Sequence, residues 1–244
     1  MNPIKSVFQT SSDWADQANV SHDSFATIGS TNDHAKSLSL DIDFFDQPKL
    51  VLANVQTQGR GRGDNQWISV AEDMALYSSW VFDVRKAPQP ITSPLIGLAT
   101  FEALKKTWPE VSFALKAPND IYVHDKKLCG LLIELVNKGE HHRLIIGLGI
   151  NVLKHPQQIS ESTHLLEHLD DFLTVEQWHT FLDQLIKNYK YQLRLITASE
   201  LEKADRVMLK KALSACPLYT DKIQDVSPAG DLIFDNHVQS WHDL

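Results

Sequence analysis

Short apolar runs separated by polar or turn-forming residues recur along this chain. Runs of this length, bounded by polar residues, are typical of buried strands. They predict strands at residues 50–56, 74–82, 112–116, 121–124, 127–136 and 143–152. The last four follow each other closely, and the polar segments HDKK and NKGEHH between them have the composition of hairpin connections. The pattern therefore predicts a sheet that occupies the middle of the chain.

Longer stretches with helical spacing lie on either side of these runs. Residues 91–108 have apolar residues about three and four positions apart, with Ser93 as the expected N-cap and Pro94 in the first turn. Residues 174–196 form a second amphipathic stretch, which Thr174 and Gln177 open with the spacing of a capping box.

A third, shorter helix is predicted after residue 30. Its sequence TNDHAKSLSL follows Ser30, and the hydroxyl of Ser30 or Thr31 can accept an otherwise unpaired backbone N–H at the start of the helix.

The two ends of the chain have a different pattern. Residues 1–24 are polar without a clear period, which predicts a loosely held arm. Residues 206–244 contain short strand-like pieces around SPAGD, which predict a small separate β domain. Residues 25–205 then form the main domain.

The composition narrows the class of protein. A net charge of -8 opposes non-specific binding to nucleic acid, which depends on neutralising phosphates. The two cysteines, Cys129 and Cys216, form no CxxC pair, so a disulfide scaffold is not expected. The N-terminal residues lack the apolar segment of a signal peptide, and no apolar run is long enough to span a bilayer. A cytoplasmic protein with no membrane partner is expected.

The segment 56–67, QTQGRGRGDNQW, differs most from this acidic background. Its glycines let the backbone approach a ligand, and its arginines suit a phosphate or carboxylate. A flexible surface loop or an RNA-binding tract rich in Arg-Gly pairs is the alternative. The position of the segment between two predicted strands favours a pocket.

A second candidate is the segment KAPND, residues 116–120. Pro118 favours an extended conformation for the residue before it, and Asn119-Asp120 favours a turn. Lys116 is therefore expected at a strand end beside a bend. A solvated terminal lysine is the alternative.

The segment HLLEH, residues 164–168, suggests an alternative hypothesis, a metal site. His164, Glu167 and His168 would share one helix face in the HxxEH order of one class of metalloproteases. A third ligand would have to come from Glu176, Glu200 or Glu202. An ordinary surface helix or loop is favoured, and no metal site is predicted.

Five motifs in order resemble those of biotin–protein ligases over residues 25–155. They are STN (30–32), QTxGRGR (56–62), KAPND (116–120), KKLCGLLIE (126–134) and GLGINV (147–152). The resemblance implies an α+β fold: a class II synthetase-like catalytic domain of mixed β-sheet flanked by helices, followed by a small SH3-like β domain.

The resemblance also implies roles for individual residues. The positions that match biotin contacts are Ser30, Thr31, Asn32, Gln56, Gly59, Arg60, Gly61, Arg62 and Lys116. The positions that match nucleotide contacts are Arg60, Arg62, Trp67, Asn119 and Asn151. Lys116 and Arg62 match the catalytic positions.

The implied reaction joins biotin and ATP, with Mg²⁺, into biotinyl-5′-AMP. The biotin is then transferred to a lysine of the biotin carrier domain of a carboxylase, of the acetyl-CoA carboxylase type. The resemblance leaves a monomer or a homodimer open. A lipoate or octanoate ligase remains an alternative enzyme, and a non-catalytic nucleotide- or RNA-binding protein is the alternative from another class.

The chain departs from the family pattern at three places. Ala117 stands where the family usually has tryptophan, and Gly63-Asp64-Asn65 replaces an arginine-rich second half of the loop. About 24 residues before residue 25, where the resemblance begins, are too few for a helix-turn-helix module, so the resemblance implies a form without an N-terminal DNA-binding domain and no DNA partner.

Overall fold

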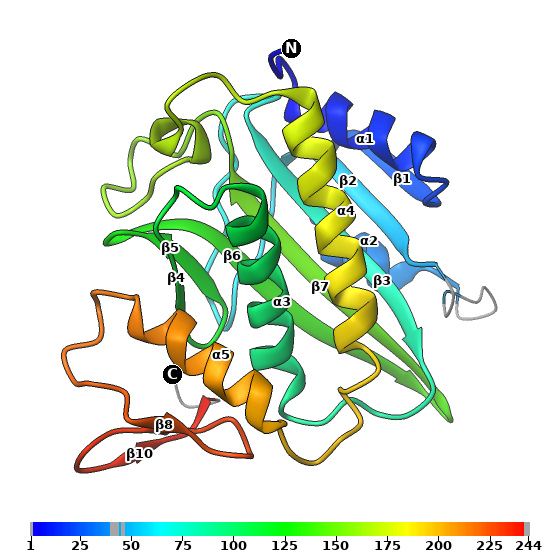
Figure 1. The fold of residues 1–244 in the computed structure, drawn as a ribbon. Coiled ribbons are helices and arrows are strands. Elements are labelled where there is room, and N and C mark those ends of the chain that lie inside the picture. Colours follow the sequence, from blue (N-terminus) through cyan, green and yellow to red (C-terminus); the bar gives the residue numbers. More distant parts are fainter. Residues whose placement is uncertain (1, 40–43, 45–46, 242–244) are drawn as a thin grey trace. The chain divides into compact units, whose positions relative to one another are not determined.

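The computed structural model describes residues 2–39, 44 and 47–241 (Figure 1). The chain forms two compact units. The first unit comprises Met1–Ala87 and Leu128–Leu182, and the second comprises Pro88–Lys127 and Asp183–Leu244. The division of the chain at residues 24 and 205 stays a proposal.

A mixed sheet forms the centre of the first unit. Its strands lie in the order β1 (His22–Ile28), β2 (Lys49–Gln56), β3 (Ala75–Val84), β7 (His141–Asn151) and β6 (Lys126–Lys138). Strands β1 and β2 are parallel, and the other neighbouring pairs are antiparallel. The sheet confirms the strands expected from the apolar runs, and with its helices it confirms the predicted fold class.

Helices cover both faces of this sheet. Successive residues of β3 point to opposite faces. The ring of Trp80 lies 5.9 Å from that of Trp14 in helix α1 (Val7–Gln17). Ser79, on the other face, donates a hydrogen bond to Thr31 in helix α2 (Thr31–Ser37). The face that carries α2 is called the α2 face below.

The expectation of a loosely held N-terminal arm is wrong. Residues 7–17 form α1, and its Trp14 is 2% exposed. Ser11 belongs to the buried side, where its hydroxyl donates to the carbonyl of Val7 at 2.7 Å and accepts from Trp178 Nε1 at 2.9 Å. Hydroxyl groups whose hydrogen bonds are made within the protein can occupy a buried helix face. A search for apolar residues alone therefore does not detect such a helix.

The second unit contains helices and two small strand groups. Helix α3 (Thr92–Thr107) lies beside the hairpin of β4 (Phe113–Lys116) and β5 (Asp120–Val123). Helix α5 (Lys203–Ser214) precedes a three-stranded sheet, whose strands are β8 (Asp225–Val226), β9 (Leu232–Ile233) and β10 (Val238–Gln239).

The prediction of strand-like pieces from residue 206 onward is therefore wrong for residues 206–214. Residues 206–214 are helical and bury Leu209, Ala212 and Leu213, which lie three and four positions apart. Strands begin only at Asp225. The short polar helix was missed because it has only one narrow apolar stripe.

The predicted caps had different outcomes. At the start of α4 (Val175–Gln192), Thr174 N–H donates to Gln177 Oε1 at 3.0 Å and Gln177 N–H donates to Thr174 Oγ1 at 3.1 Å, which confirms the capping box. The predicted Ser93 cap is wrong. Its hydroxyl donates to the carbonyl of Pro118 at 3.4 Å, a long-range partner that the local sequence does not reveal.

In the part of the chain that the structure describes, no helix combines the length and the apolarity needed to cross a membrane.

Candidate ligand site around the arginine loop

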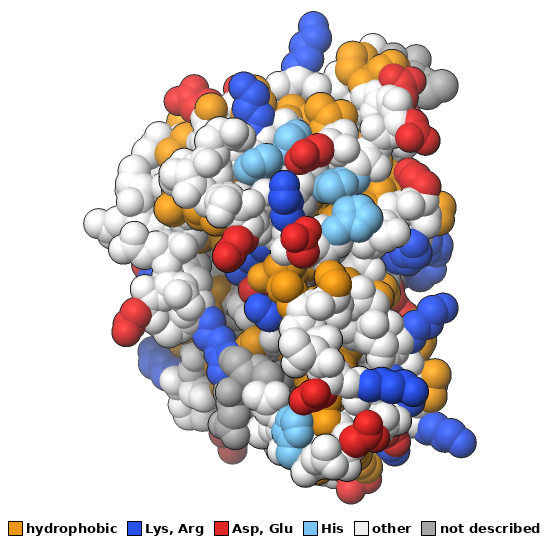
Figure 2. All heavy atoms as spheres, turned by 90° about the vertical axis from the view of Figure 1, so that its left-hand side faces the viewer, with side chains coloured by type: hydrophobic (Ala, Val, Ile, Leu, Met, Phe, Trp, Pro, Cys, Tyr) orange, Lys and Arg blue, Asp and Glu red, His pale blue; other side chains and the backbone are white. Residues whose placement is uncertain are grey.

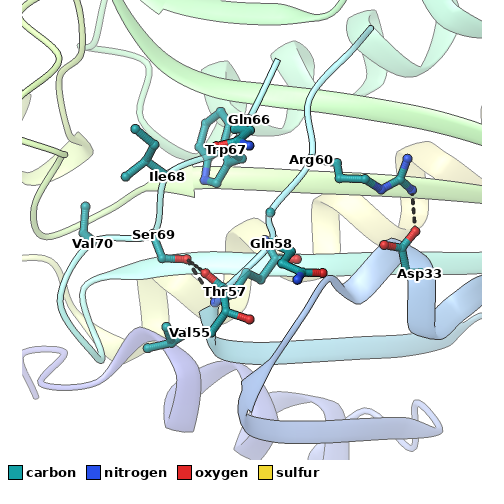
Figure 3. A pocket seen from close by; sticks show the side chains of 12 residues that line it. Asp33, Val55, Thr57, Gln58, Arg60, Gln66, Trp67, Ile68, Ser69 and Val70 are labelled. Carbon is teal, nitrogen blue, oxygen red and sulfur yellow. Dashed lines mark hydrogen bonds and ion pairs between the residues drawn. The ribbon is translucent and has the colours of Figure 1, made fainter. Parts of the chain in front are cut away.

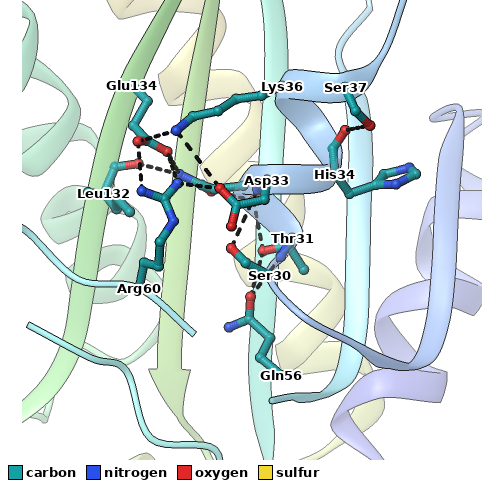
Figure 4. A network of polar contacts seen from close by, with 12 residues as sticks. Ser30, Thr31, Asp33, His34, Lys36, Ser37, Gln56, Arg60, Leu132 and Glu134 are labelled. Atoms are coloured by element: carbon teal, nitrogen blue, oxygen red, sulfur yellow. Dashed lines mark hydrogen bonds and ion pairs between the residues drawn. The ribbon is translucent and has the colours of Figure 1, made fainter. Parts of the chain in front are cut away.

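The start of α2 and the end of β2 meet on the α2 face. Ser30 caps the helix by accepting Asp33 N–H at 3.4 Å, as expected. Thr31 donates both its N–H and its hydroxyl to Gln56 Oε1, at 2.8 and 3.1 Å. These bonds fix the amide of Gln56 so that its nitrogen points away from Thr31 (Figure 4). Three residues expected at the site thus lie together.

Asn32 joins α2 to the sheet. Its side-chain nitrogen donates to Leu132 O at 3.2 Å and to Glu134 Oε2 at 2.9 Å, and its side-chain oxygen accepts from the Ser79 hydroxyl. A Cβ on Gly147 would lie 2.4 Å from Asn32 Oδ1, so a side chain at 147 would push α2 off the sheet. The glycine of the GLGINV motif is needed here for close approach.

The segment after β2 forms a narrow hairpin of its own. Trp67 N–H donates to Gly59 O at 2.9 Å, and Gly61 N–H donates to Asn65 O at 2.7 Å. A Cβ on Gly59 would lie 2.4 Å from the backbone oxygen of Trp67. Gly63, at the tip, has a φ of 60°, which favours glycine. The residues that depart from the family pattern therefore form the turn of this hairpin, called the arginine loop below (residues 57–67).

Arg60 anchors the arginine loop to the sheet through two carboxylates. Its Nη1 and Nη2 groups donate to Glu134 Oε1 and Oε2 at 3.1 and 2.7 Å, and Nη2 also lies 2.8 Å from Asp33 Oδ1 (Figure 4). Lys36 Nζ binds the same Glu134 at 2.6 Å. Such a two-pronged arginine–carboxylate pair fixes orientation as well as charge. The predicted site residues did not include Glu134, although it ends the KKLCGLLIE motif.

These contacts change the protonation of Glu134. Burial by itself would raise the pKa of Glu134, but the hydrogen bonds from Arg60, Lys36 and Asn32 together lower it below its ordinary value of 4.5. The stability that the ionised group contributes is therefore present above pH 4.5 and is lost as the pH falls through the lowered pKa of the folded state.

We expect the Glu134→Gln variant to be less stable than the parent by about 1–3 kcal/mol near pH 7, because Arg60 and Lys36 lose a charged partner. The gap should narrow as the pH falls below 4.5 and through the lowered pKa of Glu134 in the folded parent. Urea unfolding of both proteins at several pH values measures this. The exposed Glu140, changed to glutamine, is the control, and a gap that does not vary with pH would contradict the assignment.

A cavity of about 670 Å³ opens beside the arginine loop (Figure 3). Gln56, Arg60 and Asp33 provide polar lining, and Trp67 provides an aromatic wall. Trp67 packs over Gly149, where a Cβ would lie 2.6 Å from its ring. Pockets for small molecules usually measure about 300–1,000 Å³ and combine apolar walls with a few fixed polar groups. The cavity has both properties.

Arg60 Nε and Asn151 Oδ1 are among the buried polar atoms that have no hydrogen-bond partner in the described residues. Asn151 ends β7, is 3% exposed and donates through Nδ2 to Thr163 O at 3.0 Å. Buried polar atoms are nearly always paired, so each of these is a candidate contact for a bound molecule.

Lys116 and Asn119 belong to the second unit. Lys116 ends β4, as expected, and its Nζ lies 5.4 Å from the centre of the Tyr122 ring. The bend that follows contains a cis Ala117–Pro118 peptide bond. It stays a prediction that Lys116 and Asn119 contact the same ligand as Arg60. Ligand contacts for Gly61 and Arg62 also stay predictions, and Arg62 is exposed near the tip of the loop.

Residues near the C-terminus hold this bend in place. Tyr219 OH accepts Ala117 N–H at 2.9 Å, and Trp241 Nε1 donates to Pro118 O at 3.1 Å. Burial raises the pKa of Tyr219 to about 12, so its hydroxyl stays protonated. No local sequence pattern indicated a role for either residue, because each contacts a residue about a hundred positions or more away.

Comparisons with known proteins agree with these motifs. The model of the Biotin/lipoate A/B protein ligase family matches residues 24–151. The Bifunctional ligase/repressor BirA of Escherichia coli is 35% identical over 103 residues, which cover 41% of this chain and 32% of that protein. The Biotin--[acetyl-CoA-carboxylase] ligase of Mycobacterium tuberculosis is 31% identical over 123 residues, covering 48% of this chain and 45% of that protein. The match thus spans less than half of either relative.

Solved structures extend the likeness to most of the chain. The biotin protein ligase from Aquifex aeolicus, in complex with biotin and ATP, superposes with a TM-score of 0.67 at 24% identity and covers 90% of this chain and 94% of that one. The enzyme from Leishmania major, in complex with biotinyl-5-AMP, gives 0.58 at 21% identity and covers 90% and 97%. At these identities the likeness establishes the fold.

Proposed function

The chain belongs to the Biotin/lipoate A/B protein ligase family, and from this premise we propose that it is an ATP-dependent biotin–protein ligase. The observation that carries the proposal is the arginine loop, anchored through Arg60 beside a cavity of about 670 Å³. The biotin and ATP complexes of structural relatives support it.

The reaction has two steps. A carboxylate oxygen of biotin attacks the α-phosphorus of ATP, the bond to the β-phosphate bridging oxygen breaks, and pyrophosphate leaves. The product is biotinyl-5′-AMP. The neutral amine of a carrier-domain lysine then attacks the acyl carbon, an amide forms, one proton is lost, and AMP leaves with the electron pair of the broken C–O bond.

We assign biotin to Ser30, Thr31 and Gln56. Thr31 fixes the Gln56 amide through two hydrogen bonds at 2.8 and 3.1 Å, so the amide nitrogen is held in one direction for a ligand. A preorganised donor of this kind loses little conformational freedom on binding. Asn32 supports the site by holding α2 on the sheet.

The charges around Arg60 indicate that other residues must supply positive charge for the transition state. Arg60 and Lys36 are balanced by Asp33 and Glu134, so this group of four has no net charge. Arg60 Nε is the part of the guanidinium that we direct at a ligand oxygen. The additional positive charge for the transition state then falls to Arg62 and Lys116, which are the proposed catalytic residues.

The nucleotide would lie nearer to Trp67, Asn119 and Asn151. ATP would enter with Mg²⁺ bound to its phosphates. The carboxylates beside Arg60 are a poor donor set for a metal ion, because Glu134 and Asp33 are already paired with cations. Mg²⁺ would therefore be held by the ATP phosphates and not by these two carboxylates.

The carrier domain of a carboxylase is the proposed protein partner, and the cytoplasm is the proposed location. Lipoate and octanoate ligases belong to the same matched family. The GRGR loop and Gln56-Thr57 favour biotin over these acids.

The test is to incubate the full chain with labelled biotin and MgATP and to measure the adenylate and released pyrophosphate. A biotin carrier domain is then added, and transfer of label is followed. We expect adenylate with biotin and much less with lipoate or octanoate. Adenylation of lipoate alone would favour the alternative enzyme, and nucleotide binding without pyrophosphate release would leave a non-catalytic binder.

A further inference from the structure

A cluster of histidines with a glutamate lies in the segment after β7. His155 Nδ1 lies 2.8 Å from His164 Nδ1, and His164 Nδ1 lies 3.5 Å from Glu167 Oε2. One ligand atom from each of the three residues lies within 4.8 Å of the others. The side of the molecule that carries this segment in Figure 1 faces the viewer in Figure 2, where histidine and acidic side chains gather on the upper part.

The 3.5 Å between His164 Nδ1 and Glu167 Oε2 is close to the ligand spacing of a metal site, and the 2.8 Å between the two imidazole nitrogens is shorter. Ligand atoms about 2.1 Å from a tetrahedral zinc ion lie about 3.4 Å from one another. The two imidazole nitrogens alone would also suit a histidine–histidine hydrogen bond. The carboxylate of Glu167 beside the same nitrogens is not needed for that bond, but it completes a three-ligand set.

The segment that carries the cluster is held to the sheet. Leu166 N–H donates to Val152 O at 2.9 Å, and Leu165 is fully buried. Thr163 O accepts from Asn151, the last residue of β7. The backbone of the 3₁₀ helix Leu165–His168 is thus fixed at its start, which holds His164 and Glu167 near each other.

His168 has a different place from the one that the HLLEH motif suggests. Its Nε2 lies 2.7 Å from the hydroxyl of Thr163, and that hydroxyl donates to Glu167 Oε2 at 2.9 Å. His168 therefore orients Glu167 through Thr163, as groups that support metal ligands do. The motif predicts that His164, Glu167 and His168 share one helix face. In the structure, His164 and Glu167 instead form a cluster with His155.

We propose that this cluster binds one Zn²⁺ ion through His155 Nδ1, His164 Nδ1 and the Glu167 carboxylate, with water as the fourth ligand. Zinc suits two imidazoles and a carboxylate. The ligands lie beyond residues 24–151, which match the family model.

The test is Zn²⁺ titration of the metal-free full chain by calorimetry, repeated with Co²⁺ to record the visible absorption of a tetrahedral site. We expect one ion per chain. His155→Ala and His164→Ala should each weaken binding more than about 100-fold, since removing a partner that merely orients a ligand costs about 10- to 100-fold. Glu167→Gln should also weaken binding. Because glutamine keeps the shape of the glutamate side chain, this variant tests the site even if the alanine variants fold poorly.

The matched control is His141→Ala, an exposed histidine on β7 outside the cluster, which should leave the affinity unchanged. Hydrogen exchange of the segment 155–168 should slow with Zn²⁺ in the parent and stay the same in His164→Ala. Equal Zn²⁺ affinity of the parent and the cluster variants would overturn the proposal, because binding would then be scattered over surface histidines. These readouts do not depend on ligase activity.

Discussion

The Lys116→Gln variant is expected to fold normally and to form biotinyl-5′-AMP about 10²–10³-fold more slowly than the parent. The lysine ends β4, and Tyr219 and Trp241 hold the bend that follows it. We propose that its ammonium group therefore meets the phosphate and the biotin carboxylate in a fixed direction. An interaction that strengthens as charge develops lowers the barrier and adds little to ground-state affinity.

Single-turnover adenylation, measured beside biotin titration, separates these effects. The affinity for biotin should change much less than the rate. The contact of Lys116 with the Tyr122 ring has a small effect on stability, about 0.5–1 kcal/mol. Lys126→Gln, on the next hairpin and exposed, is the matched control. A Lys116→Gln protein that forms adenylate within about threefold of the parent rate would remove Lys116 from the catalytic group.

The Gly59→Ala variant is expected to lower the apparent affinity for biotin and ATP by about 5- to 150-fold while leaving the rest of the fold intact. The new Cβ would lie 2.4 Å from the backbone oxygen of Trp67, which cannot move without opening the arginine loop. Overpacking of this kind costs about 1–3 kcal/mol, which corresponds to that range in an equilibrium. The loop would spend less time closed, so its Arg60 would meet Glu134 less often.

Limited proteolysis of the loop checks the cause. Cleavage within residues 57–67 should be faster in Gly59→Ala than in the parent, and biotin with ATP should protect the parent more. Gly29→Ala is the control, because its Cβ would meet only Gln58 Oε1, at an ordinary 3.7 Å. If Gly59→Ala binds and is cleaved like the parent, closure of the loop does not require the close approach at residue 59.

The replacement of the family tryptophan by Ala117 has a structural counterpart. Ala117 is 4% exposed, and its N–H group donates to Tyr219 OH. Trp241 and Ser93 both donate to the carbonyl of Pro118, the next residue. Two aromatic residues from the C-terminal part of the same unit thus bind the backbone of residues 117 and 118.

Local patterns in the sequence determined most of the secondary structure and the motifs of the site. Apolar runs of strand length predicted β2 to β7, because burial on a sheet requires them, but they did not predict β1. The hydroxyls of Ser30 and Thr174 predicted their helix starts, because capping depends on residues three positions apart. The glycines and arginines of the loop predicted a ligand site, because they are unusual beside buried strands.

Contacts between distant residues were decided by the tertiary structure alone. The pairing of Arg60 with Glu134 joins positions 74 apart, and the support of Ala117 by Tyr219 joins positions 102 apart. The metal cluster takes His155 in place of His168, because the turn of the backbone, and not the HLLEH spacing, sets which side chains meet. The α1 helix was hidden because its buried face carries hydroxyl groups. The type of each residue determines which hydrogen bonds it can form and whether it can be buried. The tertiary structure determines which distant residue becomes its partner.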